Sequence, residues 1–127
     1  MKPVLVDTDV LINFLRGKQK AREFLLAQLE RTPILCSVIT VAEIFAGMRP
    51  HELDKTRGLL YNLEIMPVTS DIAEKAGLYK GAIKSHLLEL DDCFIAATAN
   101  LHNATLATGN VRHYPMDDIE KTAVLSD

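Results

Sequence analysis

"VLVDTDVLI", residues 4–12, contains an apolar segment that is followed by two acids, Asp7 and Asp9, and then by further apolar residues. The segment over residues 3–6 predicts a short buried strand, because strands covered on both faces are continuously apolar. Residues 9–17 predict a helix that ends at Gly17, since glycine is favoured just past a helix C-terminus. A buried strand that ends in carboxylates raises the question of what those acids do.

The rest of the chain continues this alternation of strands and helices. Apolar residues at helical spacing predict helices over 18–31, from about 40 to 47, over 53–63, from an N-cap at Ser70 to Leu87, and over 92–102. Short apolar runs predict strands over 33–37, 64–68 and 104–108, with a further edge strand over 122–125. This order predicts an α/β fold, a three-layer α/β/α sandwich with a mostly parallel central sheet.

Length and composition predict an ordinary globular protein. With 127 residues the chain is long enough for one domain, residues 1–127, but not for two. Its 48% hydrophobic and 24% charged residues fit that class. No apolar run approaches the roughly 20 residues of a membrane span, and the N-terminus lacks the pattern of a signal peptide. We therefore expect a cytoplasmic location and no membrane partner.

The net charge and the residue types bear on two kinds of site, for nucleic acid and for zinc. The net charge of −3 gives no overall basic signature for nucleic acid, so a polyanion would have to meet a local patch or a bound cation. Cys36 and Cys93 lie far apart in apolar contexts, which predicts buried, reduced thiols. The four histidines show no zinc-type pairing with each other or with the cysteines. The densest basic run, residues 16–22, is an RNA-contacting lip or, the favoured interpretation, a solvated helix face.

Acidic and amide side chains fall at corresponding places on the predicted fold. Asp7 ends the first strand, and Glu43 lies at the start of the helix after the second strand. Asp91 and Asp92 open the helix before the fourth strand, and Asn110 follows that strand. In open α/β sheets ligands bind beyond the carboxyl ends of the strands. We expect these groups to converge on one cleft, to which the first strand delivers Asp7.

Each acid taken singly also has a purely structural interpretation. Thr40 and Glu43 have the spacing of a capping box, in which Glu43 bonds back to a backbone amide. Either acid of the 91–92 pair, and either Asp7 or Asp9, would be favourable as a helix cap. Independent caps, however, have no reason to share one edge of one sheet, so together these acids favour a common site.

Carboxylates converging in a cleft of low dielectric repel one another unless cations lie between them. A ligand set of oxygens, without histidine or cysteine, selects hard cations such as Mg²⁺ or Mn²⁺. Such a site suits two-metal hydrolysis of phosphodiesters, in which one ion generates hydroxide and the other stabilises the leaving oxygen.

Four segments carry a resemblance to a known family: "VLVDTDVLINFLRG", "SVITVAEIFAGMR", "DDCFIAATA" and "ATLATGNVRHY". In this order they make the chain resemble PIN-domain ribonucleases of the VapC toxin type, found in bacterial and archaeal toxin–antitoxin pairs. The resemblance covers essentially the whole chain. It implies a PIN-like α/β/α fold, Mg²⁺- or Mn²⁺-dependent endoribonuclease activity on an RNA substrate, a homodimer, and inhibition by a cognate antitoxin protein.

The resemblance also implies which residues act. The family's metal-binding acids fall on Asp7, Glu43 and Asp92, the last preferred to Asp91 because the family's pattern begins there. A fourth catalytic position, often Asp in the family, is Asn110 in this chain, a departure that bears on a second metal. Supporting roles are expected at four nearby residues. The hydroxyls of Thr8 and Thr108 are suited to orienting the carboxylates, Asp9 is an auxiliary position, and Asp91 is a further candidate.

Three other interpretations remain open at this stage. A phosphorelay receiver domain also begins with a strand and acids, but it needs an Asp after its third strand and a late Lys, which this chain does not offer. A haloacid-dehalogenase-like phosphatase begins with a strand and Asp-x-Asp, but Leu11 departs from its motif. The third alternative is a catalytically silent protein that keeps the PIN fold and only binds a partner.

Overall fold

The computed structural model describes residues 2–126, so Met1 and Asp127 lie outside it. Strands and helices alternate as the sequence predicts. The strands are β1 (Val4–Val6), β2 (Ile34–Ser37), β3 (Glu64–Met66), β4 (Thr105–Thr108) and β5 (Glu120–Ala123). The α-helices are α1 (Thr8–Leu15), α2 (Gln19–Leu29), α3 (Val38–Gly47), α4 (Leu53–Tyr61), α5 (Ser70–Ala82) and α6 (Leu90–Leu101). Two short 3₁₀ helices, η1 (Pro50–Glu52) and η2 (Val111–His113), precede α4 and follow β4.

The five strands form one sheet in the order β3-β2-β1-β4-β5, and all neighbouring pairs are parallel. The predicted edge strand is present, but it covers 120–123 and not 122–125. The chain builds the sheet outward from β1 to β3, then crosses back to place β4 on the other side of β1. This reversal between β1 and β4 is the kind of point at which α/β sheets bind ligands.

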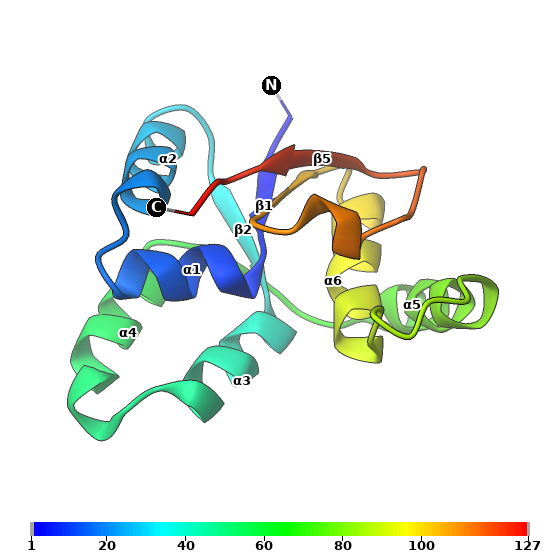
Figure 1. Ribbon diagram of the computed structural model, residues 1–127, viewed down its shortest axis with the longest axis horizontal. Helices are drawn as coiled ribbons and strands as arrows, with labels where there is room; N and C mark the ends of the chain where they lie inside the picture. Colours follow the sequence, from blue (N-terminus) through cyan, green and yellow to red (C-terminus); the bar gives the residue numbers. More distant parts are fainter. Residues whose placement is uncertain (1, 127) are drawn as a thin grey trace.

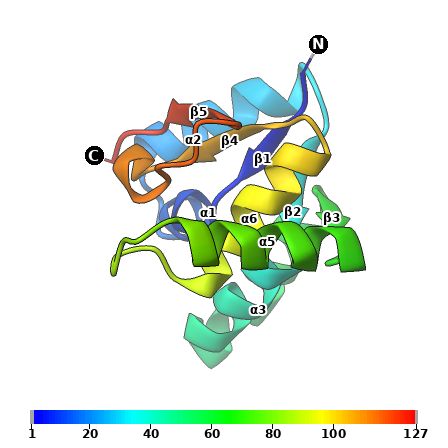
Figure 2. The same cartoon turned by 90° about the vertical axis from the view of Figure 1, so that its right-hand side faces the viewer.

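Helices cover both faces of the sheet, which confirms the three-layer α/β/α fold (Figures 1 and 2). Alternate residues of the central strand β1 pack against the helices on opposite faces of the sheet. Leu5 packs in a core with α5 and α6, whereas Val4 and Val6 pack with α1, α2, α3 and α4. Figure 2 shows α5 and α6 lying across one face, with α1 and α2 behind the sheet. Apolar side chains therefore cover both faces of β1, and the end of the strand is the first position at which a charged side chain reaches solvent.

The structure shifts the predicted boundaries of α3 and α5, and the shift in α3 bears on the site. Helix α3 begins at Val38, where the Ser37 side chain accepts from the Ile39 amide. Thr40 and Glu43 therefore form no capping box, and Glu43 lies in the second turn of the helix. Helix α5 is capped by Thr69, not Ser70, and ends at Ala82. The chain then turns so that Leu88 is buried and Leu87 is 61% exposed.

Other features agree with the sequence. Cys36 and Cys93 are free and buried. Within residues 2–126, none of the helices has the length and apolar character that crossing a membrane requires. The segment η2 follows β4 and contributes His113 to the cleft described next.

Candidate active site

An open cleft lies where β1 and β4 end, at the reversal point of the sheet. It is lined by residues from four segments: Asp7, Thr8, Asp9 and Ile12 after β1, Glu43 on α3, Asp92 on α6, and Asn110 and His113 after β4. Every acid that the sequence placed at this edge therefore faces the cleft, except Asp91, which is exposed next to Asp92. The parallel strands account for this convergence, because their carboxyl ends share one edge.

Asp7 is the most deeply placed of the acids, with an exposed fraction of 9%. Its carboxylate caps α1 by accepting from the Thr8 amide at 2.8 Å. The other oxygen accepts from Thr108 Oγ1 at 2.8 Å and from Tyr114 Oη at 2.9 Å. Burial, followed by the charge of Asp9, raises the pKa of Asp7 to about 6, against these hydrogen bonds. The predicted cap and the predicted site therefore coexist in one side chain.

Asp9 enters the cleft with one oxygen unsatisfied. Its Oδ2 accepts from the Gly109 amide at 3.0 Å, but the buried Oδ1 has no hydrogen-bond partner among the described residues. A Cβ at position 109 would lie 2.6 Å from Asp9 Oδ2, so only glycine permits this approach. Burial raises the pKa of Asp9 as well. A buried carboxylate oxygen without a donor is costly unless a cation or a proton meets it.

Glu43 is held across the cleft by α1. Thr8 Oγ1 donates to Glu43 Oε1 at 2.6 Å and lies 3.0 Å from the hydroxyl of the buried Thr40. Burial raises the pKa of Glu43, the bond from Thr8 opposes that shift, and the charges of Asp91 and Asp92 add to it. Thr8 thus positions a carboxylate, in the kind of supporting place predicted for it, and Thr40 supports Thr8.

Asp92 lies at the N-terminus of α6 and contacts both its own helix and the segment after β4. Its Oδ2 accepts from the Glu89 amide at 3.0 Å, which makes Glu89 and Asp92 a capping box. The same oxygen lies 2.7 Å from His113 Nε2. The Asp92 carboxylate is therefore shared between its own helix and the segment after β4.

The segment after β4 closes the cleft. The Asn110 amide donates to Thr108 Oγ1 at 3.1 Å, while the exposed Asn110 side chain lines the cleft. Thr108 is fully buried, accepts this bond and donates to Asp7, so it joins the two strand ends. Asp118, by contrast, bonds to Lys75 and Tyr79 and does not line the cleft.

The chemistry of the cleft fits a hard divalent cation. The side-chain atoms available to coordinate a cation are carboxylate and amide oxygens. One of them, the buried Asp9 Oδ1, has no hydrogen-bond partner among the described residues. Across residues 2–126, however, no three metal-ligating side chains are grouped closely enough to form a ready-made site. The contacts explain why, because Glu43 is turned toward Thr8 and Asp92 toward His113. An ion would have to compete with these bonds.

Sequence reasoning missed Tyr114 as a member of the site. Its ring is buried, and its hydroxyl lies 2.9 Å from Asp7 Oδ2 and 3.5 Å from Asp92 Oδ1. It stands within the segment "ATLATGNVRHY", but nothing in its spacing indicates a bond to a residue 107 positions earlier. The sequence signal for it is a tyrosine that follows the fourth strand.

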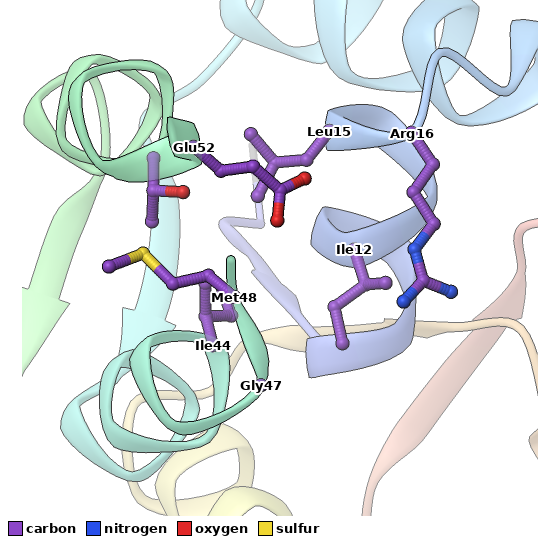
Figure 3. Close-up of a pocket in the computed structure, with 8 residues that line it drawn as sticks. Ile12, Leu15, Arg16, Ile44, Gly47, Met48 and Glu52 are labelled. Carbon is purple, nitrogen blue, oxygen red and sulfur yellow. The ribbon is translucent and has the colours of Figure 1, made fainter. Parts of the chain in front are cut away.

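An apolar cavity of about 90 Å³ adjoins the acidic cleft, and Ile12 lines both. Its walls come from α1, α3, η1 and α4 (Ile12, Leu15, Arg16, Ile44, Gly47, Met48, Glu52 and Thr56). Figure 3 shows Ile12 and Leu15 facing Met48 and Glu52 across it. An open apolar space beside a charged cleft is a feature typical of binding surfaces.

Comparisons with known proteins agree with this geometry. The family described as "PIN domain" matches residues 4–119. Ribonuclease VapC10 of Mycobacterium tuberculosis is 41% identical over 115 residues, which cover 89% of this chain and 86% of that protein. Ribonuclease VapC19 of the same species is 36% identical over 116 residues, covering 88% and 92%.

A solved structure is similar in both sequence and fold. A chain of a toxin–antitoxin complex from Klebsiella pneumoniae is 31% identical, with a TM-score of 0.75, and the match covers 91% of this chain and 94% of that one. The receiver and phosphatase interpretations are therefore wrong.

Proposed function

Because the chain belongs to the PIN-domain family, we propose that it is an endoribonuclease that acts as the toxin of a toxin–antitoxin pair. The observation that carries the proposal is the convergence of Asp7, Glu43 and Asp92 on one cleft at the reversal point of the sheet. The names of the relatives, ribonucleases, and of the neighbouring complex, a toxin–antitoxin assembly, give the reaction and the kind of partner.

We further propose that the reaction depends on Mg²⁺ or Mn²⁺. Asp7, Glu43 and Asp92 would hold the cation, with Asp9 and Asn110 as further oxygen donors beside them. Such an ion supplies a hydroxide nucleophile near neutral pH and stabilises charge on the phosphate and the leaving oxygen. A cation would also offset the charges of Asp7, Asp9 and Glu43, whose pKa values are raised first of all by burial.

The chain's own groups prepare the cleft for a phosphodiester. Thr8 and Thr108 orient Glu43 and Asp7 through their hydroxyls, so these carboxylates do not rotate freely. Without a bound cation the cleft repels RNA, and two basic side chains on η2, His113 in the cleft lining and Arg112 next to it, are available to meet phosphate. The homodimer expected from the resemblance stays a prediction.

The partner is proposed to bind over the acidic cleft and the adjoining cavity. An antitoxin that places a cationic side chain, an Arg by preference, among the carboxylates would silence them by charge pairing. An apolar side chain of the same segment would fill the cavity between α1 and α3, which exposes apolar walls to solvent in the free chain. A single antitoxin segment that spans the cleft and the cavity would recognise both the charge of the cleft and the shape of the cavity.

Incubating the purified protein with total RNA, with and without EDTA, tests the activity. Cleavage that EDTA abolishes and Mn²⁺ restores supports the proposal, and mapping the new 5′ ends then identifies the sites cut. Failure to cleave any RNA with Mg²⁺ or Mn²⁺ present, by a protein that melts cooperatively, would leave only the silent partner-binding role.

A further inference from the structure

Tyr114 connects the two carboxylates that come from opposite ends of the chain. Its hydroxyl lies 2.9 Å from Asp7 Oδ2 and 3.5 Å from Asp92 Oδ1, so its one proton goes to Asp7 while Asp92 remains within reach. A tyrosine hydroxyl carries a proton near neutral pH, and a carboxylate can only accept, so this hydroxyl acts as the donor.

The backbone around Tyr114 is held from β5. Lys121 Nζ donates to the carbonyls of Tyr114 and Met116, at 2.7 and 2.8 Å. Two charge-assisted bonds to consecutive parts of one loop fix its path, and the buried Tyr114 ring fixes the direction of the hydroxyl. A residue that only filled the core would need neither the hydroxyl nor this anchor.

Resting on the function proposed above, we infer that Tyr114 is a positioning residue of the cation site, which keeps Asp7 and Asp92 at a fixed separation, and that Lys121 holds it in place. Partners that orient the ligands of a metal typically contribute 10- to 100-fold to metal affinity or activity. The Tyr114 hydroxyl lies within reach of two such carboxylates, whereas the hydroxyls of Thr8 and Thr108 each donate to one.

The chain supplies a matched control for this inference. Tyr79 Oη donates to Asp118 Oδ1 at 2.8 Å, and neither residue lines the acidic cleft. Tyr79→Phe and Tyr114→Phe each remove one tyrosine–aspartate hydrogen bond and leave the ring in place. Only the second bond lies in the proposed cation site. Lys121→Met is a further variant, which keeps the Tyr114 hydroxyl but frees its loop.

Mn²⁺ alone, titrated into each metal-free protein by calorimetry, gives a readout that needs no RNA. We expect Tyr114→Phe to weaken Mn²⁺ binding by about 10-fold, Lys121→Met by several-fold, and Tyr79→Phe to bind as the wild type does. A thermal melt of each variant checks that the fold is intact, and Lys121→Met decides the matter if Tyr114→Phe does not melt cooperatively.

Two results overturn the inference while leaving the proposed function in place. In one, Tyr114→Phe binds Mn²⁺ with wild-type affinity. In the other, Tyr79→Phe loses as much affinity as Tyr114→Phe, which would indicate a general effect of losing a tyrosine hydroxyl. A wild-type protein that neither binds Mn²⁺ nor cleaves RNA would remove the proposed function, and the inference with it.

Discussion

Asp7 and Asp9 line the same cleft, and after burial the charge of Asp9 is the second cause that raises the pKa of Asp7 to about 6. A carboxylate with a higher pKa in the folded chain binds its proton more tightly there than in the unfolded chain. Its contribution to the free energy of unfolding is therefore complete below the unfolded pKa, near 3.8, and is lost as the pH rises through 6. The metal-free protein should be less stable at pH 8 than at pH 5.

The first prediction isolates this effect with Asp7→Asn, which cannot ionise. In EDTA, the variant should gain stability over the wild type as the pH rises from 5 to 8, by about 1.4 kcal/mol, which is the part of the roughly 3 kcal/mol for the whole pKa shift that falls in this range. Denaturant unfolding of both proteins at each pH measures the difference. If the difference in the free energy of unfolding between the two proteins stays constant across this range, then ionisation of Asp7 does not destabilise the fold.

The second prediction concerns cleavage. Asp92→Asn should lower the rate of RNA cleavage by at least about 100-fold, because it removes a ligand itself and not only a partner of one. Asp117→Asn makes the same change of charge on an exposed residue outside the cleft and should cleave normally. An Asp92→Asn variant that melts cooperatively and cleaves at the wild-type rate would mean that the site is misassigned.

The third prediction concerns Asn110, whose amide offers an oxygen but no charge. Asn110→Asp should lower the Mg²⁺ concentration at the midpoint of activity, without necessarily raising the maximal rate. Asn103→Asp adds the same charge at an exposed residue away from the cleft, so its midpoint should match the wild type. An unmoved midpoint in Asn110→Asp would show that this side chain faces away from the cation.

The fourth prediction separates partner binding from cleavage. Met48→Asp places a charge in the apolar cavity, and a partner that covered this cavity would bury the charge at a cost of roughly several kcal/mol, so antitoxin binding should weaken at least roughly 10-fold. RNA cleavage should persist, because Met48 does not line the acidic cleft. The measurement is rescue of growth by a co-expressed cognate antitoxin, with Leu101→Asp, at an exposed residue on α6, as control. Full rescue of the Met48→Asp toxin would place the partner elsewhere.

The fold and the convergence of the acids were predictable for one physical reason. Parallel strands place their carboxyl ends at one edge, so Asp7, Glu43 and Asp92 could be assigned to a common cleft from their order along the chain. The sheet confirms that reasoning about the fold, including the edge position of β5. The roles of these residues stay predictions until cleavage is measured.

The remaining contacts depend on geometry that local patterns do not carry. Whether Thr69 or Ser70 caps α5 depends on which hydroxyl meets the Ile72 amide, and both are suitable residues. The bonds from Tyr114 to Asp7 and from Lys121 to its loop depend on the path of an irregular segment. Helical or strand periodicity gives no information about such a path.

Because β1 pairs with β4, and Thr108 donates to Asp7 across 101 positions, the cleft is assembled only after most of the chain has been synthesised. On the ribosome, Asp7 and Glu43 emerge long before residues 105–114, at roughly 5–20 residues per second. Nascent chains and products of premature termination before β4 lack the partners that orient Asp7. The acids of the cleft are therefore brought together only when the last segments of the chain have left the ribosome.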